Sequence, residues 1–395
     1  MVGGTVLRKG SDMRDAVIVE AVRTPVGKRN GGLSGVHPAD LSAHVLNSLV
    51  QRAGIDPALV DDVIWGCVSQ VGEQTFDIAR TAVLTAGWPE TVTGVTVDRQ
   101  CGSSQQSVHF AAAGIVSGQY DVAVAGGVES MSRVPMGSSI GTEGARPYSQ
   151  TYLDRYDGVF PNQGIGAEMI AEQWGLSRLQ VDEFSVASHE KAAAARAEGR
   201  FDAQLAPVTL PDGTVISQDE GIRESTVEKL GSLKAVFKPE GGVITAGNAS
   251  QISDGSAALL MMSGDKAREL GLTPIARVHT AVLAGADPVI MLTAPIPATQ
   301  KALQKSGLSI DEIGAFEVNE AFAPVPLAWL AELGADVKAL NPNGGAIALG
   351  HPLGGSGARL MTTLIHHMRD NGIRYGLQTM CEGGGQANAT ILELL

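Results

Sequence analysis

Cys101 stands in a sequence context that suits nucleophilic chemistry. It follows a short strand-like segment, GVTVD (94–98), and precedes a helical segment that begins near Ser103. A helix N-terminus presents unpaired N–H groups and a partial positive charge, both of which stabilise a thiolate. We therefore expect the pKa of Cys101 to fall from about 8.5 toward neutrality, which would make its sulfur a nucleophile. Taken alone, the segment also fits a buried, inert cysteine.

A histidine that could take a proton from this thiol occurs at position 351. Of the eight histidines, His351 is the one framed by glycine and proline, in NPNGGAIALGHPLGGSGAR (341–359). Such a turn holds a side chain at the surface of a cleft, where a neutral imidazole can activate a thiol. The alternative is a loop histidine whose hydrogen bonds are satisfied locally.

A second cysteine, Cys381, ends a predicted strand and is followed by EGGGQ. Three consecutive glycines leave several backbone N–H groups free to converge on one point, as an oxyanion hole requires. The alternative is a flexible turn between the last two strands. Asn319 and Glu320 follow another strand, AFEV, at an edge where open α/β sheets bind ligands. The amide could orient water or a carbonyl, whereas Glu320 could be a helix N-terminal acid.

Composition restricts the class of protein. The net charge of −13 argues against a general nucleic-acid binder. Three widely separated cysteines without a C-x-x-C pair argue against a disulfide scaffold or a structural metal site, and favour a reducing cytoplasm. We find no secretory signal in the first fifteen residues and no apolar run of membrane-spanning length, and residues 1–13 read as an extension or a misplaced start.

Apolar periodicity predicts strands alternating with helices in two regions of similar size. We expect an α/β protein with a parallel sheet built from right-handed crossovers. An N-terminal half would span residues 14–130 and be completed by 252–273, and a C-terminal half would span 274–395. The segment 131–251 is more polar and reads as an inserted domain. Each half carries a cysteine just beyond a strand, a pattern that permits a duplication.

Other nucleotide or hydrolase motifs are missing from the sequence. GHPLGGSG lacks the ending of a Walker A loop, no G-x-G-x-x-G opens a helix after the first strand, and no G-x-S-x-G elbow is evident.

Together these pieces resemble the thiolase family over nearly the whole chain, from about Ala16 to the C-terminus. The matching motifs are VRTPVGKRNG (22–31), DRQCGSSQQS (98–107), AGGVESMSR (125–133), TAGNAS with SDG (245–255), VNEAFA (318–323), 341–359 and CEGGG (381–385). The resemblance implies a fold of duplicated αβαβα layered halves with an inserted loop domain.

The resemblance also implies roles for individual residues. Cys101 would be the acylated nucleophile, and His351 would activate it and share one oxyanion hole with a water held by Asn319. Cys381 would remove or return the α-proton of acetyl-CoA. The N–H groups of Cys101 and Gly383 would form a second oxyanion hole. The reaction would be thiolytic cleavage of a 3-ketoacyl-CoA to acetyl-CoA and a shortened acyl-CoA.

Coenzyme A would be a co-substrate bound by the loop domain, with no permanently held cofactor or metal. The residues implied to contact it are Ser250, Ala246, Gly247, Lys234, Ala321 and Phe322. The family resemblance further implies a homodimer or a dimer of dimers, with no membrane or nucleic-acid partner.

Three departures from short-chain members bear on the substrate. They are Asn162-Gln163-Gly164 in place of His-Met-Gly, Gln251 in place of Gly, and MLTAP (291–295) without the usual glycines. They favour fatty-acid or sterol side-chain breakdown over acetoacetyl-CoA chemistry. The alternatives are an acetoacetyl-CoA thiolase working in Claisen condensation, a ketoacyl or HMG-CoA synthase, and a catalytically silent acyl-CoA scaffold.

Overall fold

The computed structural model describes residues 14–140 and 146–395. The strands of the main sheet are β1 (Ala16–Arg23), β2 (Gly27–Lys28), β3 (Asp62–Gly66), β4 (Thr93–Val97), β5 (Val122–Ser130), β8 (Ser253–Ser263), β9 (Ala276–Gly285), β10 (Ala315–Val318), β11 (Tyr375–Glu382) and β12 (Gln386–Leu394). Their principal helices are α1 (Pro38–Ala53), α2 (Ile78–Thr85), α3 (Ser103–Ser117), α8 (Gly264–Glu269), α9 (Pro295–Ser306), α10 (Pro324–Leu333), α11 (Ala346–Leu349) and α12 (Leu353–Asn371).

The ten strands form one mixed sheet rather than the parallel sheet that the sequence predicted. Its order is β10-β11-β12-β9-β1-β8-β5-β3-β4, with β2 beside β8. Strand β3 is parallel to β4 and β5, and β10 is parallel to β11, but β8, β9 and β12 run antiparallel to their neighbours. The prediction failed because two connections are not helical crossovers. Strand β8 follows β5 only after the long 131–251 segment, and β12 follows β11 through a tight hairpin, which makes the two strands antiparallel.

The two halves repeat one topology. If the five strands of the first half (β1, β3, β4, β5 and β8) are numbered 1 to 5 along the chain, their order in the sheet is 3-2-4-5-1. The second half has the same order, β10-β11-β12-β9, with its third strand reduced to a bridge between Phe316 and Leu340. Strands β1 and β9 join the halves antiparallel through Val17 and Ile18. The duplication that the sequence permitted is therefore visible in the strand order.

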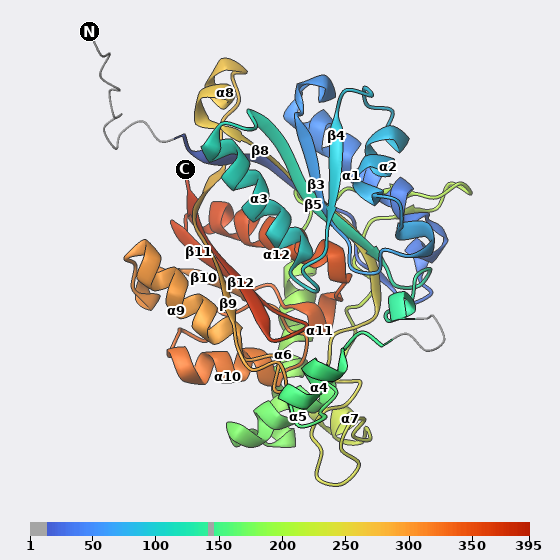
Figure 1. Ribbon diagram of the computed structural model, residues 1–395, viewed down its shortest axis with the longest axis vertical. Coiled ribbons are helices and arrows are strands. Elements are labelled where there is room, and N and C mark those ends of the chain that lie inside the picture. The colour runs from blue at the N-terminus through green and yellow to red at the C-terminus, as the bar shows by residue number, and fades with distance from the viewer. Residues whose placement is uncertain (1–13, 141–145) are drawn as a thin grey trace.

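Helices α3 and α12 pack together between the halves, while α1 with α2 and α9 with α10 cover the outer faces (Figure 1). Glycines allow the central layer to come close to the strands: a Cβ at Gly354 would lie 2.6 Å from the Cα of Cys67, and one at Gly127 would lie 2.2 Å from the Gly354 carbonyl. This contact brings the start of α12 beside β3 and β5. The predicted layered fold of two halves is confirmed.

The chain between β5 and β8 contributes no strand to the main sheet over the part that the structure describes. It holds α4 (Gln150–Arg155), α5 (Gln163–Gln173), α6 (Arg178–Ala197), α7 (Val227–Gly231) and a separate hairpin of β6 (Val208–Thr209) and β7 (Val215–Ile216). Helices α4, α5 and α7 gather at the lower end of the molecule in Figure 1. None of the helices in the described ranges is long and apolar enough to cross a membrane.

Candidate active site

Cys101 lies in a sharp turn between β4 and α3. Gln100 adopts a positive φ of 49°, and the Ser103 hydroxyl braces the turn by donating to the Gln100 carbonyl at 2.6 Å and accepting from the Arg99 N–H at 2.9 Å. Cys101 is 4% exposed, and α3 begins two residues later. The strand-to-helix position predicted from the sequence is confirmed.

The predicted fall in the pKa of Cys101 is contradicted. Burial, followed by the negative charge of Glu382, raises the pKa of Cys101 to about 12, and a hydrogen bond with the Gln163 side chain opposes this rise. The helix N-terminus does not offset the loss of water around the sulfur. The Cys101 thiol is therefore neutral at physiological pH, and its ionisation would require a base.

His351 is held with one nitrogen ready to accept a proton. Its Nδ1 lies 2.6 Å from the Ser356 hydroxyl, whose own proton is donated to the Pro352 carbonyl at 2.8 Å. The hydroxyl must therefore accept from Nδ1–H, so the proton is absent from Nε2. Asn319 places its Nδ2 3.3 Å from Nε2. Burial and the Arg359 charge lower the pKa of His351 to about 3, so the imidazole is neutral at physiological pH.

Cys381 and the glycines after it occupy the end of β11 and the hairpin turn to β12. Gly384 and Gly385 have φ of 83° and 75°, so the turn itself requires two of the three glycines. No main-chain carbonyl in the described residues accepts from the N–H of Cys101 or of Gly383. Burial and then the neighbouring Cys101 raise the pKa of Cys381 well above its usual value. The segment therefore forms a tight turn between the last two strands and also leaves the Gly383 N–H group without a main-chain acceptor.

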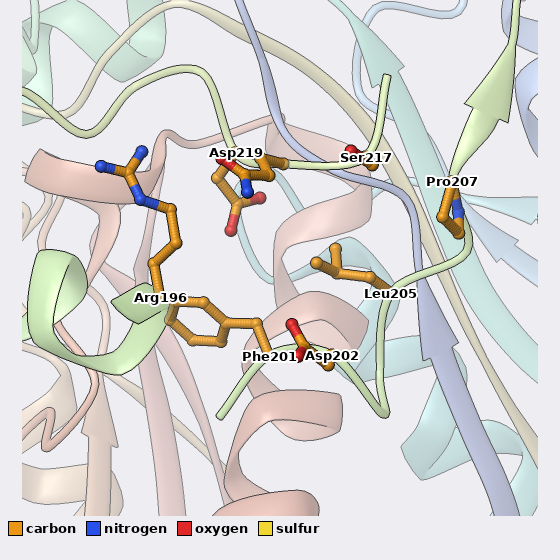
Figure 2. A pocket seen from close by; sticks show the side chains of 8 residues that line it. Arg196, Phe201, Asp202, Leu205, Pro207, Ser217 and Asp219 are labelled. Atoms are coloured by element: carbon orange, nitrogen blue, oxygen red, sulfur yellow. The ribbon is translucent and has the colours of Figure 1, made fainter. Parts of the chain in front are cut away.

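Two adjoining cavities meet at the candidate site. One, of about 530 Å³, is lined by Cys101 and Gly383, and the other, of about 250 Å³, by His351. Both are lined by Met136, Gln163 and Leu353. Cys381 and Asn319 are each 1% exposed and are not part of the lining of either cavity. A third cavity, between α6 and the segment around Asp219, contains none of the predicted site residues (Figure 2).

Four of the six residues expected to contact coenzyme A line the smaller cavity: Ser250, Ala246, Ala321 and Phe322. The Ser250 N–H donates to the Ala321 carbonyl at 2.9 Å, which ties the two walls together. Gly247 and Lys234 are not part of the lining. Gly247 is packed close to Leu230 and Leu233, and Lys234 is exposed in the segment after α7.

Met291 and an aromatic group shape the larger cavity. Met291 has a positive φ of 61°, a conformation that favours glycine, and it is one of the residues that line this cavity. Tyr148 and Phe160 also line it and contact each other edge to face, with ring centroids 4.9 Å apart. A methionine where glycine is expected thus adds apolar wall to the cavity beside Cys101.

Several supporting residues were not identified from the sequence. Glu320 is not a helix N-terminal acid: its carboxylate accepts from Ser188 at 2.7 Å, Asn341 at 2.8 Å and the Ile347 N–H at 3.2 Å. It therefore ties α6 to the loop that carries His351. Its burial could not be read from the sequence, because a glutamate after a strand is usually solvated.

Gln251, noted above only as a departure, braces the same loop. Its amide Nε2 donates to the Gly221, Ile347 and Ala348 carbonyls at 2.8–3.1 Å. Glu129 joins the two halves by accepting from the Val68, Ser69 and Gly354 N–H groups at 2.8–3.1 Å. Carboxylates and amides thus fix the loop positions around the site.

Comparisons with known proteins find relatives over nearly the whole chain. The thiolase N-terminal domain family matches residues 16–265, and the thiolase C-terminal domain family matches residues 272–394. The chain is 51% identical over 393 residues to a steroid 3-ketoacyl-CoA thiolase, FadA6, of Mycobacterium tuberculosis, covering 98% of this chain and 96% of the relative. It is 47% identical to a 3-ketoacyl-CoA thiolase of Pseudoalteromonas translucida, covering 96% and 99%. An acetyl-CoA acetyltransferase structure from Bacillus anthracis superposes with a TM-score of 0.90 at 40% identity, covering 97% and 99%.

Proposed function

Because the chain belongs to the thiolase family, we propose that it is a degradative acetyl-CoA C-acyltransferase, which cleaves a 3-ketoacyl-CoA with coenzyme A. The observation that carries this proposal is the pair of adjoining cavities, one beside Cys101 and one beside His351. A thioester lying in the smaller cavity can place its 3-keto carbon at the sulfur and its acyl tail in the larger one.

In the first half-reaction, Cys101 attacks the 3-keto carbon. The sulfur is a buried neutral thiol, and the unprotonated Nε2 of His351 is the base that takes its proton. Cleavage of the bond between the α and β carbons leaves the acyl group on Cys101 and releases the enolate of acetyl-CoA. The enolate carries the developing charge, so donors fixed at its oxygen lower the barrier most.

Cys381 returns the proton to the enolate carbon in this proposal. A buried thiol with a raised pKa keeps its proton until a strongly basic carbon needs it. The N–H groups of Cys101 and Gly383 suit one oxyanion hole, and His351, once protonated on Nε2, suits another with Asn319 beside it. In the second half-reaction, the Cys381 thiolate takes the thiol proton of coenzyme A, whose sulfur attacks the acyl group. Cys101 leaves as a thiolate and recovers its proton from Nε2 of His351, which restores both thiols and the neutral imidazole.

We assign the pantetheine arm to the smaller cavity, with Ser250 and Ala246 on one wall and Ala321 and Phe322 on the other. The segment 131–251 contributes the first wall, in keeping with a role as the loop domain that holds coenzyme A. Lys234 is exposed near this end, where a cation can reach the nucleotide phosphates. No cofactor besides this co-substrate is required by the chemistry.

The acyl group is proposed to be larger than acetoacetyl. The larger cavity extends past Cys101 to Met136, Ile140, Tyr148 and Phe160, which a four-carbon substrate would not reach. The relative named a steroid 3-ketoacyl-CoA thiolase favours a fatty-acid or sterol side-chain substrate. Condensation of two acetyl-CoA molecules is the second candidate, favoured by the neighbour named an acetyl-CoA acetyltransferase.

A thiolysis assay over a panel of acetoacetyl-CoA, straight-chain 3-ketoacyl-CoA and steroid side-chain 3-ketoacyl-CoA tests this assignment. We expect kcat/KM to be higher for the longer substrates. Turnover of acetoacetyl-CoA alone would contradict the degradative assignment, and no turnover by any member would contradict thiolysis itself.

We also propose a cytoplasmic homo-oligomer. The three cysteines are free and buried, as expected in a reducing compartment. Strand β4 is an edge of the main sheet, and the side chains of Val95, Leu84 and Phe110 near it are 43–49% exposed. An unpaired edge beside exposed apolar side chains suits pairing with a second copy. Light scattering after size-exclusion chromatography will show whether the chain is a dimer, a tetramer or a monomer.

A further inference from the structure

Glu382 is a buried carboxyl to which the proposed mechanism gives no task. It directly follows Cys381, is 0% exposed, and neither carboxyl oxygen has a side-chain hydrogen-bond partner that the described residues provide. A buried, unpaired carboxylate is costly, because the interior replaces water poorly as a solvent for charge. At a reactive centre, such a carboxyl can serve either as a neutral group or as a group whose charge changes with pH.

The carboxyl lies against the residue that follows the nucleophile. A Cβ at Gly102 would stand 2.0 Å from Oε1 of Glu382 and 2.7 Å from the amide nitrogen of Asn388. A side chain at 102 would displace these two groups, and the carboxyl reaches the backbone between Cys101 and α3. The Asn388 side-chain amide stabilises this backbone by donating a hydrogen bond to the Gly102 carbonyl at 3.0 Å.

The charged and titratable neighbours of Glu382 are few. From the loop before α3 they are Arg99 and Cys101, and from its own strand Cys381. Strand β12 presents the neutral Asn388 and Gln386. Arg99 donates to Gln386 at 3.0 Å, and no ion pair within 4.0 Å joins it to Glu382 among the described residues.

These surroundings determine the charge of the carboxyl. Burial raises the pKa of Glu382 to about 8, and the Arg99 guanidinium opposes the rise. The group is thus mostly neutral at pH 7 and ionises in mild alkali. Once ionised, it raises the pKa of both Cys101 and Cys381 and stands beside the N–H groups proposed to receive the enolate oxygen.

We propose that Glu382 is a positioning residue that supports the two thiols in its protonated form and, by ionising beside Gly102, limits the gain in Cys101 reactivity as the pH rises. The proposal rests on the thiolase function proposed above. Glu382 acts through its charge. The neutral carboxyl places no negative group beside the proposed oxyanion hole, whereas the carboxylate repels the thiolate and the enolate. A purely structural Glu382 would have no such pH dependence.

The test compares iodoacetamide alkylation of Cys101 in the wild-type protein and in Glu382→Gln from pH 6 to pH 9.5, with the alkylated peptide identified by mass spectrometry. The amide imitates the protonated carboxyl. We expect equal rate constants at pH 6 and a rate constant about tenfold higher in the variant at pH 9.5, corresponding to about one pKa unit at the thiol. The exposed Glu183→Gln on α6 is the matched control and should follow the wild type.

A ratio of the two rate constants that does not change with pH would overturn the proposal. If Glu382→Gln fails to fold, Arg99→Met provides a second test. Loss of the opposing cation should move the flattening of the wild-type alkylation rate, at the pH where Glu382 ionises, to higher pH. A flattening at an unchanged pH would also overturn the proposal. Because alkylation requires no turnover, a wild-type protein without thiolysis activity would instead show that the proposed function fails.

Discussion

The Nδ1 atom of His351 lies 2.6 Å from the Ser356 hydroxyl, which in turn donates to the Pro352 carbonyl one helical turn earlier. This pair determines which imidazole nitrogen carries the proton. It leaves Nε2 as the acceptor in a residue whose pKa burial has lowered to about 3. A serine at the start of α12 thus determines which nitrogen of the candidate base is free of a proton.

Replacing this hydroxyl tests the arrangement. In Ser356→Ala, Nδ1 loses its acceptor, and we expect kcat/KM for thiolysis to fall about tenfold, or ~1.4 kcal/mol, the usual value of a hydrogen bond to a group that becomes charged. Steady-state kinetics with a long-chain 3-ketoacyl-CoA measures the change. Ser356→Thr keeps the hydroxyl and should retain most of the activity; equal losses in both variants would point to packing instead.

Substitution of the two candidate active-site cysteines should have different effects on the two half-reactions. Cys101→Ala should reduce both thiolysis and exchange of acyl groups between coenzyme A molecules by more than about 10³-fold, because each passes through the acyl-enzyme. Cys381→Ala should lose thiolysis but retain exchange better, because exchange needs no proton on carbon. Parallel assays with labelled coenzyme A measure both reactions. Equal loss of the two in Cys381→Ala would refute its assigned role.

The larger cavity predicts how the acyl group is recognised. Phe160→Ala removes an exposed aromatic wall, and we expect KM for a long-chain 3-ketoacyl-CoA to rise about tenfold, from the loss of ~1.4 kcal/mol of apolar contact. The KM for acetoacetyl-CoA should not change, since its acyl group ends near Cys101. Leu179→Ala, an exposed apolar residue on α6, is the control. A rise in KM for both substrates would place Phe160 outside the acyl site.

We expect buried histidines to lower the free energy of unfolding in acid. Burial lowers the pKa of His109 from its ordinary value of about 6.5 to about 3. The unfolded chain therefore binds a proton first as the pH falls, and the free energy of unfolding decreases between pH 6.5 and pH 3, by up to about 1.4 kcal/mol per pH unit for this residue. In His109→Gln, urea unfolding should show a drop between pH 7 and pH 5 that is smaller by about 2 kcal/mol. An identical drop would mean that His109 does not contribute.

Much of the fold could be predicted, because apolar periodicity and turn residues are local signals. The strand before Cys101 and the helix from Leu353 to Asn371 lie where the pattern placed them. Strand direction was predicted wrongly, since the antiparallel position of β8 depends on where the chain returns after the 131–251 segment, and no local pattern records this.

At the candidate site, the sequence predicted which residues lie at the cavities better than it predicted their electrostatics. Cys101, His351 and Gly383 line adjoining cavities as expected, but the Cys101 pKa rises because burial outweighs the helix terminus. Burial is set by the packing of both halves and cannot be read from five residues around a cysteine. Glu382 and Ser356 were overlooked for the same reason, since their importance depends on what lies beside them in space.

The central claim is that Cys101 receives the acyl group of a cleaved 3-ketoacyl-CoA. Its most direct test is the first half-reaction: the protein is mixed with a long-chain 3-ketoacyl-CoA in the absence of free coenzyme A, quenched in acid, and analysed by mass spectrometry. We predict one acyl group, two carbons shorter than the substrate chain, on the Cys101 peptide, with an equal amount of acetyl-CoA released. Absence of the adduct, or an adduct on another residue with Cys101 unmodified, would contradict the account.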